Sequence, residues 1–358
     1  MTRASIEEHV FVARPPGAAP LAVLKDGHTL LVRDAQARET SRWHLAPLDA
    51  RNDALALAPA GASRQAAPPL PDLLAALETV FALQPVLAHV QLDVPAHWWS
   101  GLRGSGLTLP RAPQDAAVVS RDMFWQQAGL WLPQTPAQPY PLRYALTDGR
   151  RHPLRPAKQH GTLYQRHIPW LGGSLSLRAL DIEQDLARFN RWMNDPVVAQ
   201  FWQEEGDEAK HRAYLEGIAA DPHMQSLVAC FEGEPFGYFE TYWAKENRIA
   251  PFYDAADFDR GWHVLIGEPA FRGKPYATAW FPSIAHYLFL DDPRTQRIVG
   301  EPRSDHHRQI GNLLRSGYAH LKDFDFPHKR ASLVMLLRER FFGDALWHPR
   351  PRATTPQD

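Results

Sequence analysis

The chain is poor in features that mark secreted, membrane and nucleic-acid-binding proteins. It has one cysteine in 358 residues, which excludes an internal disulfide framework and a cysteine-rich zinc site and is typical of the cytoplasm. No run of about 18 apolar residues occurs and the first residues lack an apolar signal core, so we expect neither export nor a membrane span. Lysine and arginine number 39 against 40 acidic residues, so no overall field favours nucleic acid or an anionic membrane.

What is present is an ordinary globular composition. Hydrophobic residues make up 44% of the chain and charged residues 22%, values that favour a folded, soluble protein. The length suits two domains better than one. Tryptophan is abundant, with 12 residues that supply large apolar area and flat faces for core packing or for the wall of a pocket.

The first half of the chain predicts a mixed α/β domain over residues 1–165. Leu73, Leu74, Leu77, Val80 and Leu83 share one face of an expected helix over 71–85, which Pro85 closes. Short β-type runs surround it, over 9–13, 21–24, 29–34 and 86–95. The stretch 133–174 is rich in Pro, Gly and Arg with weak periodicity, so we place the domain boundary near residue 165.

The second half, residues 166–347, has sharper signals and ends in a polar tail, 348–358, that we expect to be frayed. Its elements are expected in the order β-α-α-β-β-β-α-β-α-β-β. The strands are predicted over 175–180, 225–233, 234–244, 261–269, 295–302, 320–326 and 330–342, and the helices over 181–194, 207–220, 272–290 and 305–317.

Four motifs in this half narrow the interpretation: RWMNDPVVAQFW (191–202), FDRGWHVLIGE (258–268), DPRTQRIVGEPRSDHHR (292–308) and FDFPHKRASLVM (324–335). Together they resemble the acyltransferases of hydroxamate-siderophore biosynthesis in the GCN5-related N-acetyltransferase (GNAT) superfamily, nearest to the N-hydroxylysine acetyltransferases of the aerobactin pathway. The resemblance implies an α/β GNAT fold, in which a mixed, mostly antiparallel sheet carries flanking helices. We expect the N-terminal half to be a degenerate relative of this fold.

The resemblance also implies an activity. Such enzymes move an acyl group, usually acetyl, from coenzyme A to an N-hydroxylated amine, and the product is a hydroxamate that binds iron(III). The implied co-substrate is acetyl-CoA or another acyl-CoA, the acceptor is a hydroxylated lysine, ornithine or diamine, and enzymes of the same pathway are the expected partners. The alternatives are a GNAT acting on another amine, such as an aminoglycoside, and a non-catalytic scaffold that binds acyl-CoA.

His263 and Asp305 match the family's catalytic histidine and its acidic partner. The reference pKa of histidine, about 6.5, suits a base for the proton released during acyl transfer. The acidic partner would orient the imidazole or bind the hydroxylamine group. The structural alternatives are a hydrogen-bonded histidine inside a strand and an N-cap at the start of the helix.

The expected cofactor site is the end of the same strand and the loop after it. In this fold the strand separates from its neighbour, so the backbone of Leu265, Ile266 and Gly267 is free for the pantetheine arm. Arg272, Gly273 and Lys274 occupy the position that receives the pyrophosphate, since helix N-termini and glycine favour a bound anion. Two prolines depart from the pattern: Pro275 has no amide proton, and Pro282 suggests a kink or a late helix start.

The acceptor site is expected among aromatic and charged side chains near the catalytic strand. Trp202, Tyr242 and Trp243 would bracket an aliphatic chain or simply pack, and Glu240 would hold a substrate ammonium. His328 and Lys329, at a turn in the FPHKR motif, would contact a substrate carboxylate or face solvent.

Cys230 lies in the middle of a predicted strand, where core packing is favoured, so we expect direct acyl transfer in a ternary complex without an acyl-cysteine. The adjacent His306 and His307 face different directions on a helix, and we expect no metal site.

Overall fold

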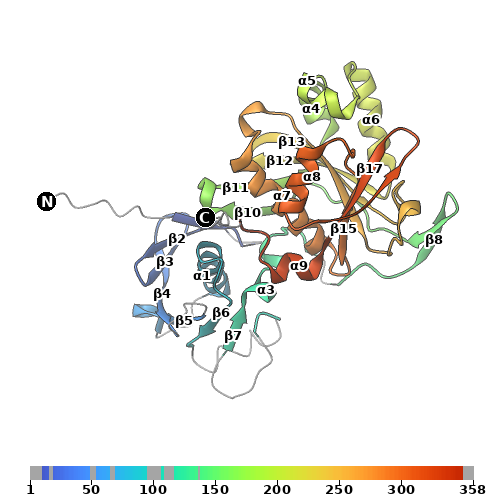
Figure 1. Cartoon of the computed structure of the whole chain (residues 1–358). Coiled ribbons are helices and arrows are strands. Elements are labelled where there is room, and N and C mark those ends of the chain that lie inside the picture. The colour runs from blue at the N-terminus through green and yellow to red at the C-terminus, as the bar shows by residue number, and fades with distance from the viewer. Residues whose placement is uncertain are drawn as a thin grey trace, which may run out of the picture. The chain divides into compact units, whose positions relative to one another are not determined.

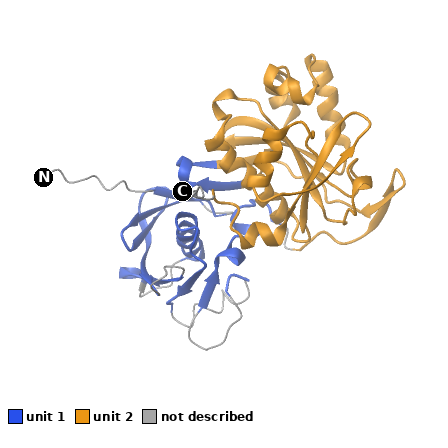
Figure 2. Cartoon of the chain, viewed as in Figure 1, with its two compact units in different colours: residues 1–135, 165–174 blue, residues 136–164, 175–358 orange. Residues whose placement is uncertain are grey.

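The chain divides into two compact units, shown in different colours in Figure 2. The computed structural model describes residues 10–15, 19–48, 54–64, 69–94, 106–108, 117–135 and 138–349. Unit 1 comprises residues 1–135 and 165–174, and unit 2 comprises 136–164 and 175–358. This division differs from a single boundary at 165, because the segment 136–164 groups with the C-terminal part. The expected frayed tail lies, from residue 350 onward, outside the described residues.

Unit 1 contains a seven-stranded sheet whose strands follow in chain order. All neighbours are antiparallel except β5 and β6, which are parallel and are connected by a segment containing α1. The elements are β1 (Val10–Ala13), β2 (Leu21–Asp26), β3 (Thr29–Arg33), β4 (Glu39–Pro47), β5 (Ala54–Pro59), α1 (Leu70–Leu83), β6 (His89–Leu92), β7 (Ala117–Ser120) and α3 (Arg121–Phe124).

The helix predicted over 71–85 is confirmed as α1, and its face of Leu73, Leu77 and Val80 is buried. An antiparallel meander followed by a parallel β-α-β crossover is also the order of the central strands of unit 2. This shared order is what a degenerate GNAT copy would retain, and that origin for the N-terminal half stays a prediction.

An eight-stranded sheet, most of whose residues belong to unit 2, has the order β10-β11-β12-β13-β14-β15-β17-β16. Neighbouring strands are antiparallel from β11 through β14, and β17 is antiparallel to both β15 and β16. The pair β14 and β15 is parallel. Its strands are β10 (Thr162–Ile168), β11 (Gly173–Ala179), β12 (Met224–Phe231), β13 (Glu234–Trp243), β14 (Arg260–Ile266), β15 (Arg297–Gly300), β16 (Ala319–Asp325) and β17 (Arg330–Leu337); a separate hairpin is formed by β8 (Tyr144–Thr147) and β9 (Arg150–Pro153).

The helices of unit 2 interrupt the strands in the predicted order. They are α4 (Ile182–Met193), α5 (Pro196–Trp202), α6 (Glu208–Ala220), α7 (Lys274–Asp291), α8 (His307–Arg315) and α9 (Arg338–Gly343). Two were not expected, α5 and α9. Asp195 ends the expected helix and its side chain then accepts hydrogen bonds from the amides of Val197 and Val198, which starts α5 at once. A late start of α7 was wrong, because the helix begins at Lys274 and continues through Pro282.

Two sets of helices cover the sheet of unit 2 (Figure 1). Side chains of the helices α4, α5 and α6 form one core cluster with side chains of the strands β12, β13 and β14. The cluster includes Phe189 and Leu215 from the helices and Tyr238 and Leu265 from the strands. Alternate residues of the same strands, such as Phe239 and Trp262, contact Trp280 of α7 instead. Because side chains alternate across a strand, β14 presents His263 to the first side and Trp262 to the second.

Gly261 is required by close packing within the sheet. A Cβ at this position would lie 2.2 Å from the ring of Tyr242, which is fully buried. We predict that Gly261→Ala lowers the free energy of unfolding by about 1 to 3 kcal/mol, as overpacking does. The matched control is Gly217→Ala in α6, where a Cβ meets nothing within 4 Å and the better helix former should add up to about 1 kcal/mol. Urea denaturation of both variants tests this, and equal effects would contradict it.

Candidate active site

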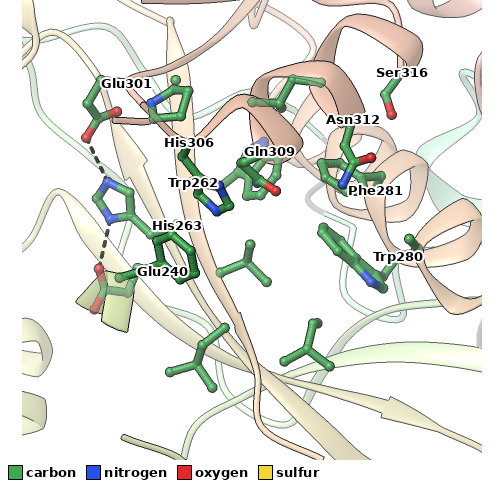
Figure 3. Close-up of a pocket in the computed structure, with 18 of the residues that line it drawn as sticks. Glu240, Trp262, His263, Trp280, Phe281, Glu301, His306, Gln309, Asn312 and Ser316 are labelled. Atoms are coloured by element: carbon green, nitrogen blue, oxygen red, sulfur yellow. Dashed lines mark hydrogen bonds and ion pairs between the residues drawn. The ribbon is translucent and has the colours of Figure 1, made fainter. Parts of the chain in front are cut away.

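A pocket of about 1750 Å³ opens in unit 2. Small-molecule sites commonly measure about 300 to 1000 Å³, so this one has room for two substrates together. Its walls come from α5, β14, α7, α8 and the loops that follow β13 and β16. Figure 3 shows a chain of three charged side chains on one side of the pocket and Trp280, Phe281, Asn312 and Ser316 on another.

The three charged side chains are Glu240, His263 and Glu301. The antiparallel register of β13 and β14 places Glu240 directly opposite His263, and Glu301 follows the last residue of β15. The imidazole Nδ1 lies 2.9 Å from Oε2 of Glu240, and its Nε2 lies 2.9 Å from Oε1 of Glu301. Both ring nitrogens therefore face a carboxylate (Figure 3).

Tyrosine hydroxyls complete the hydrogen bonding of the two carboxylates. Tyr214 and Tyr238 donate to Oε1 of Glu240, and Tyr242 donates to Oε2 of Glu301 at 2.8 Å. The carboxylate side chains are 3% and 1% exposed, so these donors replace water. Burial, together with the nearby carboxylates, raises the pKa of Tyr238 and of Tyr242, which keeps both phenols neutral as donors.

The charges of the three groups depend on one another. Burial alone would lower the pKa of His263, but the field of Glu301 and the hydrogen bonds to both carboxylates raise it to about 9. Burial would likewise raise the pKa of Glu301, and the charge and hydrogen bond of His263 hold it well below its usual range. At pH 7 the site therefore holds an imidazolium between two carboxylates.

The strand that carries His263 separates from its parallel neighbour within a few residues. Among the described residues, the β14–β15 ladder pairs Arg260 with Ile298 and Gly261 with Val299 and then ends. The pocket reaches the backbone of β14 beyond this point, at Val264, Leu265 and Ile266. The expected splay is thus present, and these residues fit the pantetheine arm of an acyl-CoA.

Some of the backbone groups expected to be free have partners. The Gly267 amide donates to the Phe236 carbonyl at 3.0 Å, and a Cβ on Gly267 would lie 2.1 Å from the ring of Trp192. Packing against Trp192 therefore accounts for this glycine. The Trp202 indole donates to the Val264 carbonyl at 3.2 Å, so Trp202 does lie beside the catalytic strand.

The basic loop before α7 is held to the strand by its own arginine. Arg272 donates to the carbonyls of Ile266 and Gly267 at 2.8 and 2.9 Å and pairs with Asp195 at 3.1 Å. Gly273 precedes α7 with φ of 122°, a conformation that favours glycine. Lys274 and the first turn of α7 line the pocket, which fits a pyrophosphate at a helix N-terminus. The contact of Arg272 with a phosphate stays a prediction.

Asp305 does not contact His263. Its carboxylate accepts hydrogen bonds from Arg303 at 3.0 and 2.8 Å, its side chain is 65% exposed, and it is not among the residues that line the pocket. It is not the N-cap of α8 either, since His306 holds that position. The carboxylate of this segment that faces the imidazole is that of Glu301, four positions earlier. The role predicted for Asp305 in binding the hydroxylamine group stays a prediction.

The residues predicted for the acceptor divide into two groups. His328 and Lys329 line the pocket near Glu301, and Lys329 Nζ donates to the Glu301 carbonyl at 2.8 Å. Tyr242 and Trp243 are buried outside the pocket lining; Tyr242 supports Glu301, and Trp243 packs under the guanidinium groups of Arg155 and Arg260. Glu240 gives its carboxylate to His263 and the tyrosines, so its contact with a substrate ammonium stays a prediction.

No cluster of three or more His, Cys, Asp or Glu side chains in the part of the chain that the structure describes is arranged to hold a metal ion. None of the helices described there combines the length and the apolar character needed to cross a bilayer.

Three features fit an acyltransferase of the GNAT type: the splayed parallel strand pair, the crossover helix whose first turn lines the pocket, and the half-buried imidazole between two carboxylates. Comparison with known proteins places the chain in that class. Residues 181–326 match the acetyltransferase (GNAT) domain family.

Three named relatives extend the match. N(6)-hydroxylysine O-acetyltransferase of Escherichia coli is 40% identical over 271 residues, which cover 75% of this chain and 84% of that protein. A Schizosaccharomyces pombe protein, provisionally named as a lysine N-acyltransferase, is 44% identical over 63% of this chain and 67% of its own length. The N(5)-hydroxyornithine:cis-anhydromevalonyl coenzyme A-N(5)-transacylase of Beauveria bassiana is 40% identical over 63% of this chain and 57% of its own length.

The chain belongs to this family of GNAT acyltransferases, as the long match to the Escherichia coli protein establishes. The resemblance read from the four motifs is thereby confirmed, and so is the fold class. The protein is an enzyme of the acyltransferase class.

Sequence reasoning missed Glu301, Tyr214 and Arg248 as parts of this site. The glutamate stands in the EPRSD segment four positions before the predicted Asp305, inside the strand predicted over 295–302, and in the structure that strand ends at Gly300 and leaves Glu301 at its end. Arg248 Nη2 lies 3.4 Å from Oε1 of Glu301, and it follows β13 in a segment without a motif of its own.

The raised pKa of His263 predicts a dependence of stability on pH. The folded state keeps the imidazolium up to about pH 9, whereas an unfolded histidine loses its proton near pH 6.5. The stabilisation is therefore complete below about pH 6.5 and is lost as the pH rises through about 9, by up to about 3 kcal/mol. Urea denaturation near pH 6.5 and near pH 9.5 measures this loss. His263→Gln should show a smaller decline, and parallel declines in both proteins would contradict the ion chain.

Proposed function

We propose that the protein transfers an acetyl group from acetyl-CoA to the nitrogen of an N-hydroxylated amino-acid side chain and so forms a hydroxamate for siderophore biosynthesis. The observation that carries the proposal is the position of the His263 imidazole, between Glu240 and Glu301 on the splayed strand β14. The names of the relatives from Escherichia coli and Beauveria bassiana, which specify hydroxylysine and hydroxyornithine, support this acceptor class.

A hydroxylamine acceptor suits a site of this kind. It is less basic than an alkylamine, so much of it is neutral near pH 7 and needs no proton removed before attack. The site must then accept one proton as the C–N bond forms and must stabilise the oxyanion. The group of Glu240, His263 and Glu301 carries one net negative charge at pH 7, which makes it a sink for that proton.

Direct transfer in a ternary complex is the proposed route. The neutral nitrogen attacks the thioester carbonyl, backbone N–H groups of β14 near Val264 and Ile266 donate to the oxyanion, and the nitrogen's proton passes to the Glu301 carboxylate, which stays hydrogen-bonded to the imidazolium of His263. Collapse of the intermediate breaks the C–S bond and releases coenzyme A as its thiolate. The state of Cys230 supports this route, because its thiol is 3% exposed and burial raises its pKa, so it is a poor nucleophile.

Nitrogen is the proposed nucleophile, although the hydroxyl oxygen of the acceptor is the other candidate and the Escherichia coli relative is named for transfer to oxygen. The two products differ in chemistry. An N-acyl product is a hydroxamic acid that binds iron(III) through two oxygens, whereas an O-acyl product has lost its free hydroxyl.

The proposal includes a cytoplasmic location and contact with other enzymes of the pathway as expectations. A hydroxylated amine must be supplied by an N-hydroxylating enzyme, and a hydroxamate must be consumed by a ligase that joins it to a carboxylate. Acetyl is the proposed acyl group because the Escherichia coli relative is named for acetyl transfer.

The activity is testable by thiol release. We expect turnover of acetyl-CoA with N6-hydroxylysine or N5-hydroxyornithine, much lower turnover with lysine or ornithine, and a product that gives a coloured complex with iron(III). Activity on plain amines or aminoglycosides without activity on hydroxylated acceptors would sink the proposal. Coenzyme A binding without any turnover would point to a scaffold instead.

The assignment of Glu301 gives a second test. We predict that Glu301→Gln lowers kcat by about 10²- to 10⁴-fold, the usual contribution of a positioned acid-base group. The matched variant is Asp305→Asn, which alters a carboxylate in the same segment that is exposed and pairs with Arg303; it should lower kcat far less. If Asp305→Asn is the more damaging change, the resemblance-based assignment is correct and ours is wrong.

A further inference from the structure

Three basic side chains gather around one aromatic ring at the end of the pocket next to Glu301. The guanidinium of Arg248 lies 5.5 Å from the centre of the Phe326 ring, Nζ of Lys329 also lies 5.5 Å from it, and the imidazole of His328 stacks on it at 5.4 Å. Arg248, His328 and Lys329 all line the pocket. We call these three residues the basic cluster.

The cluster leaves the catalytic end of the pocket with an excess of one positive charge. Glu246 is paired with Arg155, Glu204 with Lys210, and Arg303 with Asp305. Setting these pairs aside, the carboxylates of Glu240 and Glu301 face the cations of His263, Arg248 and Lys329. Burial and the charges of Arg248 and Lys329 lower the pKa of His328, so His328 adds a neutral hydrogen-bonding group. An anionic ligand group would balance this charge.

Arg248 is placed to meet such a group. Its side chain is 50% exposed, and its Nη2 contacts Oε1 of Glu301 at 3.4 Å while a guanidinium has five donors in all. The segment that carries it is anchored, because Arg150 donates to the carbonyls of Glu246 and Asn247 and Arg155 binds the Glu246 carboxylate. A fixed guanidinium is the group best suited to bind a carboxylate through two hydrogen bonds.

The distance from the reacting centre suits an amino-acid side chain. Oε1 of Glu301 lies between the two groups, 2.9 Å from Nε2 of His263 and 3.4 Å from Nη2 of Arg248. The distance between these two nitrogens therefore cannot exceed the sum of the two contacts. The methylene chain of a lysine or ornithine acceptor can span such an interval, with its hydroxylamine nitrogen near His263 and its carboxylate at Arg248.

The phosphates of coenzyme A belong to the opposite end of the same strand. Arg248 lies shortly after Trp243, and Trp243 pairs with Arg260, the first residue of β14. Lys274, the first residue of α7, follows the loop after Ile266, the last residue of β14. Seven residues of strand span about 20 Å, so the basic cluster and the first turn of α7 lie at separate ends.

We propose that Arg248, assisted by Lys329, binds the α-carboxylate of the acceptor and selects hydroxylated amino acids over hydroxylated diamines. This specificity role rests on the proposed function. The inference adds to the proposed function one residue of the protein and one group of the substrate, which together discriminate among acceptors that share the hydroxylamine group.

The test compares N6-hydroxylysine with its primary carboxamide, in which a neutral amide of nearly the same size replaces the carboxylate. In thiol-release assays with acetyl-CoA, the wild-type kcat/KM should favour the acid by about 10- to 100-fold, the range of a charge-assisted hydrogen bond. In Arg248→Met the ratio of the two kcat/KM values should fall toward one, mainly through KM for the acid. Because the ratio compares two acceptors on one protein, general damage to the variant cancels.

The matched control is Arg303→Met, which removes an arginine that also lines the pocket but is paired with Asp305; its ratio should stay at the wild-type value. Lys329→Met provides a second variant, with a partial fall expected. Equal wild-type kcat/KM for acid and carboxamide, or a ratio that survives both Arg248→Met and Lys329→Met, would overturn the carboxylate site and leave the proposed function standing. Failure to acylate either acceptor would overturn the proposed function and this inference together.

Discussion

The arrangement of the site depends on one imidazolium that lies between two carboxylates. Glu240 and Glu301 are almost completely buried, and an isolated carboxylate in such a place would be strongly destabilising. His263 compensates both, at 2.9 Å on each side. The three charged groups come from β13, β14 and the end of β15. They therefore connect the antiparallel strands up to β14 with β15, the strand on the other side of the parallel pair. Their proton state is shared, and the reaction would use the three groups as one unit.

The separation of β14 from β15 gives this unit access to substrates. The ladder ends after Gly261, two residues before His263, so the imidazole stands where the pocket meets the strand edge. Arg272 fixes the far end of β14 by holding the carbonyls of Ile266 and Gly267, and this in turn positions the start of α7. A single strand therefore carries the proposed catalytic group in its middle, a proposed cofactor site at one end and a proposed carboxylate site at the other.

Much of the fold could be predicted because its signals are local. The helix expected over 207–220 is α6, the hairpin expected across Gly233 joins β12 and β13, and Cys230 is in the core. The roles predicted for Asp305 and Arg272 depend on a ligand or on distant segments, and they stay predictions. Their partners in the structure are near in the chain, Arg303 for the aspartate and the carbonyls of Ile266 and Gly267 for the arginine, and the direction in which each loop leaves its strand decides which nearby group each side chain meets.

The sequence by itself determined the order of most strands and helices of unit 2, and its motifs indicated the acyltransferase class and His263 as the candidate catalytic residue, because hydrophobic periodicity and motifs are read along the chain. Only the tertiary structure decided which carboxylates face that histidine, which tyrosines support them and which cations remain for a ligand. The physical reason is that strand register, strand splay and burial bring together residues as distant as Tyr214, His263 and Glu301 and set their charges, and these are properties of the packed sheet rather than of any segment.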